Sequence, residues 1–135
     1  MSNADVYEVR DYKPEDKAFI MSTFLRGLYY GDSWFSSMPK DLFMNHYKVI
    51  ADAILNKHTV KVACLKEDPD IILGYSILSK DFSTIHWVFV KSSFRKLGVS
   101  KALLPKFPNF VTHLTPLGKS LMIKFPNCVF NPFAI

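Results

Sequence analysis

The chain has 135 residues, of which 49% are hydrophobic, 15% aromatic and 21% charged. This composition excludes a disordered chain, and the length predicts one compact domain over residues 1–135. No apolar run reaches the ~18 residues of a membrane span, so we expect no membrane contact. The net charge of +5 favours an anionic partner, which could be nucleic acid, an acidic protein surface or the phosphates of a nucleotide cofactor.

The N-terminus and the cysteines predict a reducing, cytoplasmic location. No basic flank followed by an apolar stretch, as in a secretory signal, occurs at the start of the sequence. Cys64 and Cys128 stand far apart and have neither zinc-ligand spacing nor a redox motif. We therefore expect free thiols, with Cys64 buried in a strand.

The N-terminal half predicts one strand followed by two helices. A strand is expected at residues 5–11, and Pro14 starts a helix whose apolar residues recur at helical spacing over residues 17–30. A second helix is expected over residues 39–56. Between them, residues 29–35 form an aromatic-rich loop, which either packs over a helix end or lines a substrate opening.

Three strands and a loop–helix segment follow. The strands are expected at residues 59–65, 71–79 and 84–90, with spacings that suit an antiparallel meander. Residues 94–104 then read as a loop passing into a helix, which Pro105 ends. The remaining elements are a strand at residues 110–114, a helix at 116–124 and an extended piece at 128–133. This order predicts an α/β fold, a mixed sheet with helices on both sides.

The loop before the fourth helix carries the chemistry that the sequence reveals. Gly98 leaves room for backbone N–H groups to approach a phosphate at a helix start, and Ser100 is also small. Arg95, Lys96 and Lys101 add positive charge for a pyrophosphate. Without further information, the same glycine could also belong to an ordinary turn.

The segment resembles the coenzyme A loop of the GCN5-related N-acetyltransferase (GNAT) family, which reads Arg/Gln-x-x-Gly-x-Gly/Ala after the fourth strand. The matching residues are Arg95-Lys96-Leu97-Gly98-Val99-Ser100. Phe94, the preceding strand and the element order from about Val6 to Leu114 also fit the family. The resemblance implies the GNAT acyl-CoA N-acyltransferase fold.

The resemblance also implies a co-substrate, acetyl-CoA, lying in a splay between the fourth and fifth strands. The loop N–H groups would hold its pyrophosphate, and the backbone of the fourth strand would pair with its pantetheine. The implied contact residues are Phe89, Val90, Arg95, Lys96, Leu97, Gly98, Val99, Ser100 and Lys101. The implied partner is an amine-bearing acceptor, either a small molecule or a protein.

The chain departs from the family pattern at several positions. Ser92 and Ser100 replace the proline and the last small residue that the family often has. The fourth strand lacks the family's frequent glutamate, which leaves His86 as the candidate base, although a strand histidine can also be structural. No tyrosine follows Tyr75, so the usual proton donor has no counterpart.

Three functions stay open at this point. The first is an N-acetyltransferase that uses acetyl-CoA on an amine. The second is a non-catalytic GNAT-like binding or assembly protein, which the missing acid and base would allow. The third, a small basic nucleic-acid binder, is disfavoured because no recognition motif occurs. The short C-terminal arm predicts a closing hairpin reduced to one strand, and its apolar tail could pack on the sheet or form a homodimer.

Overall fold

The computed structural model describes residues 6–113 and 115–135, without the side chains of Lys96, Leu97 and Leu117. One six-stranded sheet organises these residues, in the order β1-β2-β3-β4-β5-β6. The strands are β1 (Tyr7–Asp11), β2 (Thr59–Leu65), β3 (Ile72–Leu78), β4 (Thr84–Val90), β5 (Phe110–Val111) and β6 (Val129–Phe130). The α-helices are α1 (Lys17–Gly31), α2 (Ser33–Ser36), α3 (Lys40–Lys57), α4 (Val99–Leu103) and α5 (Pro116–Lys124), and 3₁₀ helices form at Pro14–Asp16 and Ser92–Leu97.

The sheet is mixed. Strands β1 to β4 pair in antiparallel fashion, whereas β4–β5 and β5–β6 are parallel pairs. The predicted meander of three strands is therefore confirmed. The single strand β6 closes the C-terminal arm, in agreement with the reduced hairpin that the sequence predicts.

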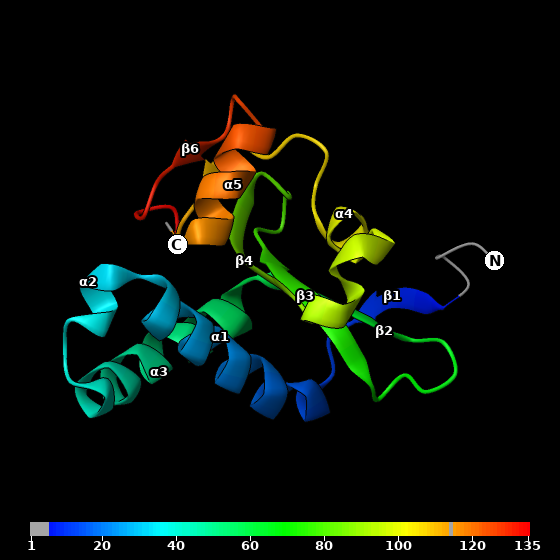
Figure 1. Cartoon of the computed structure of the whole chain (residues 1–135), viewed down its shortest axis with the longest axis horizontal. Coiled ribbons are helices and arrows are strands. Elements are labelled where there is room, and N and C mark those ends of the chain that lie inside the picture. Colours follow the sequence, from blue (N-terminus) through cyan, green and yellow to red (C-terminus); the bar gives the residue numbers. More distant parts are fainter. Residues whose placement is uncertain (1–5, 114) are drawn as a thin grey trace.

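The helices cover opposite faces of the sheet (Figure 1). Helices α1 and α3 bury the larger core, where Phe24 stacks on Trp87 at 4.8 Å between ring centroids. Helix α4 packs through Val99 and Leu103, and α5 through Leu121, on the other face. The two-sided layering explains why β3 is buried at every position, because helices exclude water from both of its faces.

A β-bulge in β4 changes the direction of its side chains. Ile77 of β3 pairs with Trp87 and Leu78 pairs with Ile85, so His86 has no residue opposite it. As a result, Trp87 packs in the core beneath α1 and α3, whereas Ile85 packs on the side of α5.

The differences from the sequence prediction are local. Residues 33–36 form α2 instead of remaining in a loop, because the Asp32 side chain accepts hydrogen bonds from the Trp34 and Phe35 N–H groups and caps this turn. Strand β5 ends at Val111 rather than at 114, and Leu114 itself lies outside the described residues. None of the helices in the described ranges is both long and apolar enough to cross a bilayer.

The C-terminal tail leaves apolar side chains at the surface. Phe133 is 91% exposed, and Phe130 of the edge strand β6 is also exposed. The predicted homodimer would have this surface available, and it stays a prediction.

Candidate functional site

One edge of β4 is open along most of its length. Strand β5 pairs with β4 only at Thr84 and Ile85, and one further bond runs from the Thr112 N–H group to the Ile85 carbonyl oxygen at 3.2 Å. Beyond Ile85 the two strands separate. The splay that the family resemblance implies between the fourth and fifth strands is therefore present.

The register identifies which backbone groups face the splay. The Lys91 N–H group donates to the Leu73 carbonyl oxygen at 2.8 Å, which makes this a hydrogen-bonded pair of the antiparallel ladder. Hydrogen-bonded and non-hydrogen-bonded pairs alternate, so Phe89 directs its N–H and C=O groups to Tyr75 of β3. The polar groups of Val88 and Val90 point to the open side instead. This register disagrees with the predicted contact between the Phe89 backbone and pantetheine, because it leaves Val88 and Val90, and not Phe89, with backbone groups on the open side.

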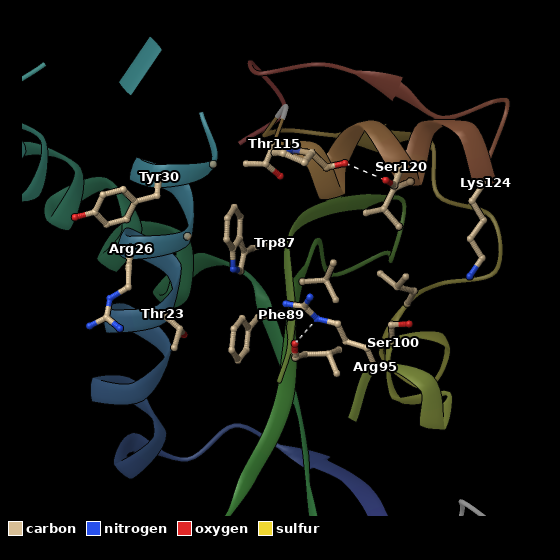
Figure 2. A pocket seen from close by; sticks show the side chains of 17 residues that line it. Thr23, Arg26, Tyr30, Trp87, Phe89, Arg95, Ser100, Thr115, Ser120 and Lys124 are labelled. Atoms are coloured by element: carbon tan, nitrogen blue, oxygen red, sulfur yellow. Dashed lines mark hydrogen bonds between the residues drawn. The ribbon is translucent and has the colours of Figure 1, made fainter. Parts of the chain in front are cut away.

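A cavity of about 870 Å³ extends along this open edge (Figure 2). Its floor is β4 from Trp87 to Val90, one wall is α1, and the other wall consists of α4, α5 and the loop before α4. A volume of this size is typical of sites for cofactors and other organic ligands. The cavity therefore extends from the open edge of β4 toward α1 on one side and toward α4 and α5 on the other.

Arg95 is fixed beside the open edge. Its Nε atom donates to the Val90 carbonyl oxygen at 3.1 Å. Within the described residues, neither terminal nitrogen of its guanidinium has a hydrogen-bond partner. This orientation leaves a planar pair of donors available to a phosphate group, the geometry in which arginine binds phosphate best.

The predicted coenzyme A loop contributes fewer side chains than the motif suggests. Phe89, Val90, Arg95 and Ser100 line the cavity, whereas Gly98, Val99 and Lys101 do not. Val99 is fully buried in the core under α4. The side chains of Lys96 and Leu97 lie outside the described part of the chain.

Gly98 has a conformational role in this loop. Its φ of +77° places it in the left-handed region, between the 3₁₀ helix and α4. An added Cβ atom would meet only the Tyr7 hydroxyl oxygen, at 3.9 Å, so space does not require a glycine there. A substitution at Gly98 would therefore not test phosphate binding alone, because any side chain at this φ strains the backbone.

The charges around the cavity are of one sign. Arg26, Arg95 and Lys124 line it, and no aspartate or glutamate is found among its described lining residues. Figure 2 shows Arg95 on the α4 side, Lys124 at the end of α5, and Arg26 across β4 on α1. The cavity is consequently suited to an anionic ligand.

His86 is not part of this cavity. Its side chain is 1% exposed, and its ring stacks on His58 with 3.8 Å between centroids. Burial lowers the pKa of His86 to about 3, so the ring is neutral at pH 7. A base must reach the reacting amine, and the structure places this ring away from the cavity wall.

His86 instead belongs to a buried chain of hydrogen bonds. Its Nδ1 atom lies 3.2 Å from Thr112 Oγ1, which lies 2.9 Å from His113 Nδ1. His113 Nε2 in turn lies 2.6 Å from the Tyr47 hydroxyl oxygen, and burial lowers the pKa of His113 to about 4. Both imidazoles are thus neutral structural groups. They join α3 to the closed end of β4, which is the end at Thr84 and Ile85 where β5 pairs with it.

Sequence reasoning indicated only part of the α1 and α5 walls: Tyr30 lies in the aromatic segment that could line a substrate opening, and Thr23, Arg26 and Lys124 were missed. Arg26, Tyr30 and Thr23 recur at helical spacing on one side of α1, but their residue types carry no motif. Lys124 and Thr115 come to the cavity because α5 folds back over the sheet. The helical spacing of Thr23, Arg26 and Tyr30 is the one sequence signal that could have predicted which side of α1 lines the cavity.

No family model matches the chain, and no curated protein matches it in sequence. Among solved structures, a GCN5-related N-acetyltransferase from Rhodopseudomonas palustris, described as "aminotransferase, class-II", is 19% identical with a TM-score of 0.50. That match covers 73% of this chain and 61% of the other. The apo form of YjaB from Escherichia coli is 14% identical over 90% of this chain and 67% of its own, with a TM-score of 0.46.

A third similar structure is yncA from Salmonella typhimurium, solved with its cofactor acetyl-CoA. It is 15% identical with a TM-score of 0.44, over 72% of this chain and 58% of the other. The chain thus spans about three fifths of the length of the Rhodopseudomonas and Salmonella proteins. The Rhodopseudomonas match shows that the chain has the fold of the GCN5-related N-acetyltransferases.

Proposed function

We propose that this protein is an N-acetyltransferase that transfers the acetyl group of acetyl-CoA to an amine. The observation that carries the proposal is the open edge of β4, where Val88 and Val90 present backbone groups to a cavity with Arg95 beside it. These are the two kinds of contact that a pantetheine amide and a pyrophosphate require.

The residues present fit acetyl-CoA. Arg95 offers its terminal nitrogens to phosphate oxygens, with Lys124 adding charge from the end of α5 and Ser100 offering a hydroxyl. Val88, Leu104 and Leu121 supply apolar surface along the cavity for the pantetheine arm. The N–H groups of Val88 and Val90 and the C=O group of Val88 can pair with its amides as a further strand would, while the Val90 C=O group already accepts from Arg95.

In the proposed reaction, the thioester supplies an activated acetyl group. The amine nitrogen attacks the thioester carbonyl, a C–N bond forms and the C–S bond breaks, and the coenzyme A thiolate leaves. The amine's proton passes to water, because no carboxylate or imidazole is found among the described lining residues. What the chain contributes is positioning of the two reactants in one cavity.

Thr115 is the hydroxyl best placed to assist the leaving thiolate. Its Oγ1 atom accepts from the Gly118 N–H group at 3.3 Å as the cap of α5, so its own hydrogen remains free to donate. The Ser120 hydroxyl, in contrast, already donates to the Pro116 carbonyl oxygen at 3.0 Å. A hydroxyl does not protonate a thiolate at neutral pH, but a hydrogen bond from it stabilises the charge.

A second candidate function is acetyl-CoA binding without turnover. It is favoured by the same lack of a titratable base among the described lining residues. The two functions share the cavity and differ only in whether the thioester is consumed.

The test is a calorimetric titration with acetyl-CoA, followed by a thiol-release assay with a panel of amines. Wild-type protein is expected to bind acetyl-CoA and to release coenzyme A when an amine is present. Ser100→Glu, which places a carboxylate in the cavity, should abolish binding, whereas Lys101→Glu, outside the cavity, should not. Binding without release would support the second function, and no binding by folded wild-type protein would overturn both.

A further inference from the structure

We propose that the acceptor is a small amine that also carries a carboxylate, namely an apolar α-amino acid, and that Arg26 binds the carboxylate. The inference rests on the proposed function, because it assigns to the acceptor the part of the cavity that acetyl-CoA would not occupy. It concerns the α1 wall, whose lining residues include Thr23, Arg26 and Tyr30.

The two walls of the cavity divide its cations. Arg95 and Lys124 lie on the side of α4 and α5, where the phosphates of acetyl-CoA would be bound (Figure 2). Arg26 lies on the opposite side, on α1, so the same phosphates do not account for it. Within the described residues Arg26 forms no ion pair, and this exposed residue lines the cavity. An anionic group on the second reactant would complete its interactions.

The sign of the charge also excludes some acceptors. A lysine side chain brings an ammonium with a pKa of about 10.4 and no compensating charge. It would meet three cations and, among the described lining residues, no carboxylate. An α-amino acid carries its own carboxylate next to the amine, so its net charge is zero and Arg26 attracts one end of it.

The surface beside Arg26 suits an apolar side chain. The indole of Trp87 and the ring of Phe89 form the floor next to α1. Gly27 keeps α1 close to this floor, because a Cβ there would lie 2.9 Å from Trp87 Cζ2. The acceptor's carbon skeleton would pack on these rings while its carboxylate meets Arg26.

The test compares amines that have the same shape and differ in charge. The pairs are phenylalanine, methionine and leucine with their respective amides, assayed by coenzyme A release from acetyl-CoA. We expect kcat/KM to be at least about 10-fold higher for the acids, the effect of one charge-assisted contact. Arg26→Gln should bring the acid-to-amide ratio close to one by raising the KM for the acids, and Arg26→Lys should retain part of it.

Two controls separate this proposal from the proposed function. Lys48→Gln removes an exposed charge from α3 outside this cavity and should leave the ratio unchanged. The acetyl-CoA affinity of Arg26→Gln, measured by calorimetry, should equal that of the wild type. Equal use of acids and amides, a ratio that persists in Arg26→Gln, faster turnover of Nα-acetyl-lysinamide, or no turnover of any of these amines by protein that binds acetyl-CoA would each overturn the acceptor assignment alone. Failure of wild type to bind acetyl-CoA would overturn the proposed function on which it rests.

Discussion

The two ends of β4 have the same neighbour on one side and different neighbours on the other. Strand β3 pairs with β4 from Ile85 to Val90 except at the bulge residue His86, whereas β5 pairs with β4 only at Thr84 and Ile85. The closed end is sealed by the buried chain of His86, Thr112 and His113, whereas the open end borders the cavity. The comparison teaches that a single short strand creates the site, because its early end leaves backbone groups of β4 without a partner.

Strand β5 is short for a local reason. Thr115 caps α5, and Pro116 occupies the first turn of that helix. Proline has no N–H group to continue a ladder and its φ suits a helix start, so the chain must leave the sheet before it. The sequence that starts α5 therefore also opens the edge of β4.

The largest expected effect concerns the closed end at low pH. His86 and His113 have pKa values of about 3 and about 4 when folded, below the ordinary 6.5, because burial disfavours the charged imidazole. The unfolded chain therefore takes up protons that the folded chain rejects, and stability present above pH 6.5 is lost as the pH falls toward 4. Urea unfolding should show a loss of about 2 kcal/mol per histidine between pH 7 and pH 5.

Two variants test whether this pH-dependent loss of stability comes from the buried histidines at the closed end of β4. His113→Leu should be less stable at pH 7, since the Tyr47 hydroxyl loses its partner, yet its stability should depend less on pH. His46→Gln removes an exposed histidine of α3 and should keep the wild-type dependence. An unchanged pH slope in His113→Leu would show that the buried chain does not stay neutral.

The next effect concerns the packing of α5 against the residues at the closed end of β4. A Cβ added at Gly118 would overlap the His113 carbonyl oxygen, and backbone cannot yield as a flexible side chain can. Gly118→Ala should therefore lower the free energy of unfolding by about 2 kcal/mol. Gly31→Ala is the matched control, because its Cβ would lie 3.6 Å from Thr115 Cγ2, an ordinary contact, and alanine suits a helix. Equal urea midpoints for the two variants would contradict this packing.

The smallest effect concerns the open end. Arg95→Gln removes the guanidinium that the Val90 carbonyl oxygen orients, and we expect its Kd for acetyl-CoA to rise about 10-fold, or about 1.4 kcal/mol. Lys101→Gln, with the same loss of charge on α4 but outside the cavity, should change the Kd less than twofold. Calorimetry on both variants makes the comparison. Similar losses in both would mean that general charge, and not the position of Arg95, governs binding.

The sequence predicted the fold better than it predicted the site. Periodicity and turn residues identified the strands β2 to β4 and the helices α1, α3 and α5, because apolar residues recur at helical spacing in the helices and turn residues bound the runs of β-forming residues. The loop motif led to Arg95 and Ser100, which line the cavity. It also led to Val99, which is a core residue, and to the Phe89 backbone, which β3 already engages.

The errors have a common physical origin. A motif gives the order of residues along the chain, but the register of β3 against β4 decides which backbone groups are free. His86 was a candidate base with a structural role as the alternative, and the structure, in which it stacks on His58 beside the bulge in β4, agrees with the structural role. Register and bulges depend on pairing between distant segments, which a single sequence does not display.

Amide hydrogen exchange along β4, followed by NMR with and without acetyl-CoA, tests the central claim most directly. The N–H groups of Val88 and Val90 face the open edge and should become protected when acetyl-CoA is added. The Phe89 N–H group, bonded to β3, should be protected in both states and act as the internal control. Protection of Val88 and Val90 by acetyl-CoA would support the open edge as its binding site, and unchanged exchange at saturating acetyl-CoA would contradict the account.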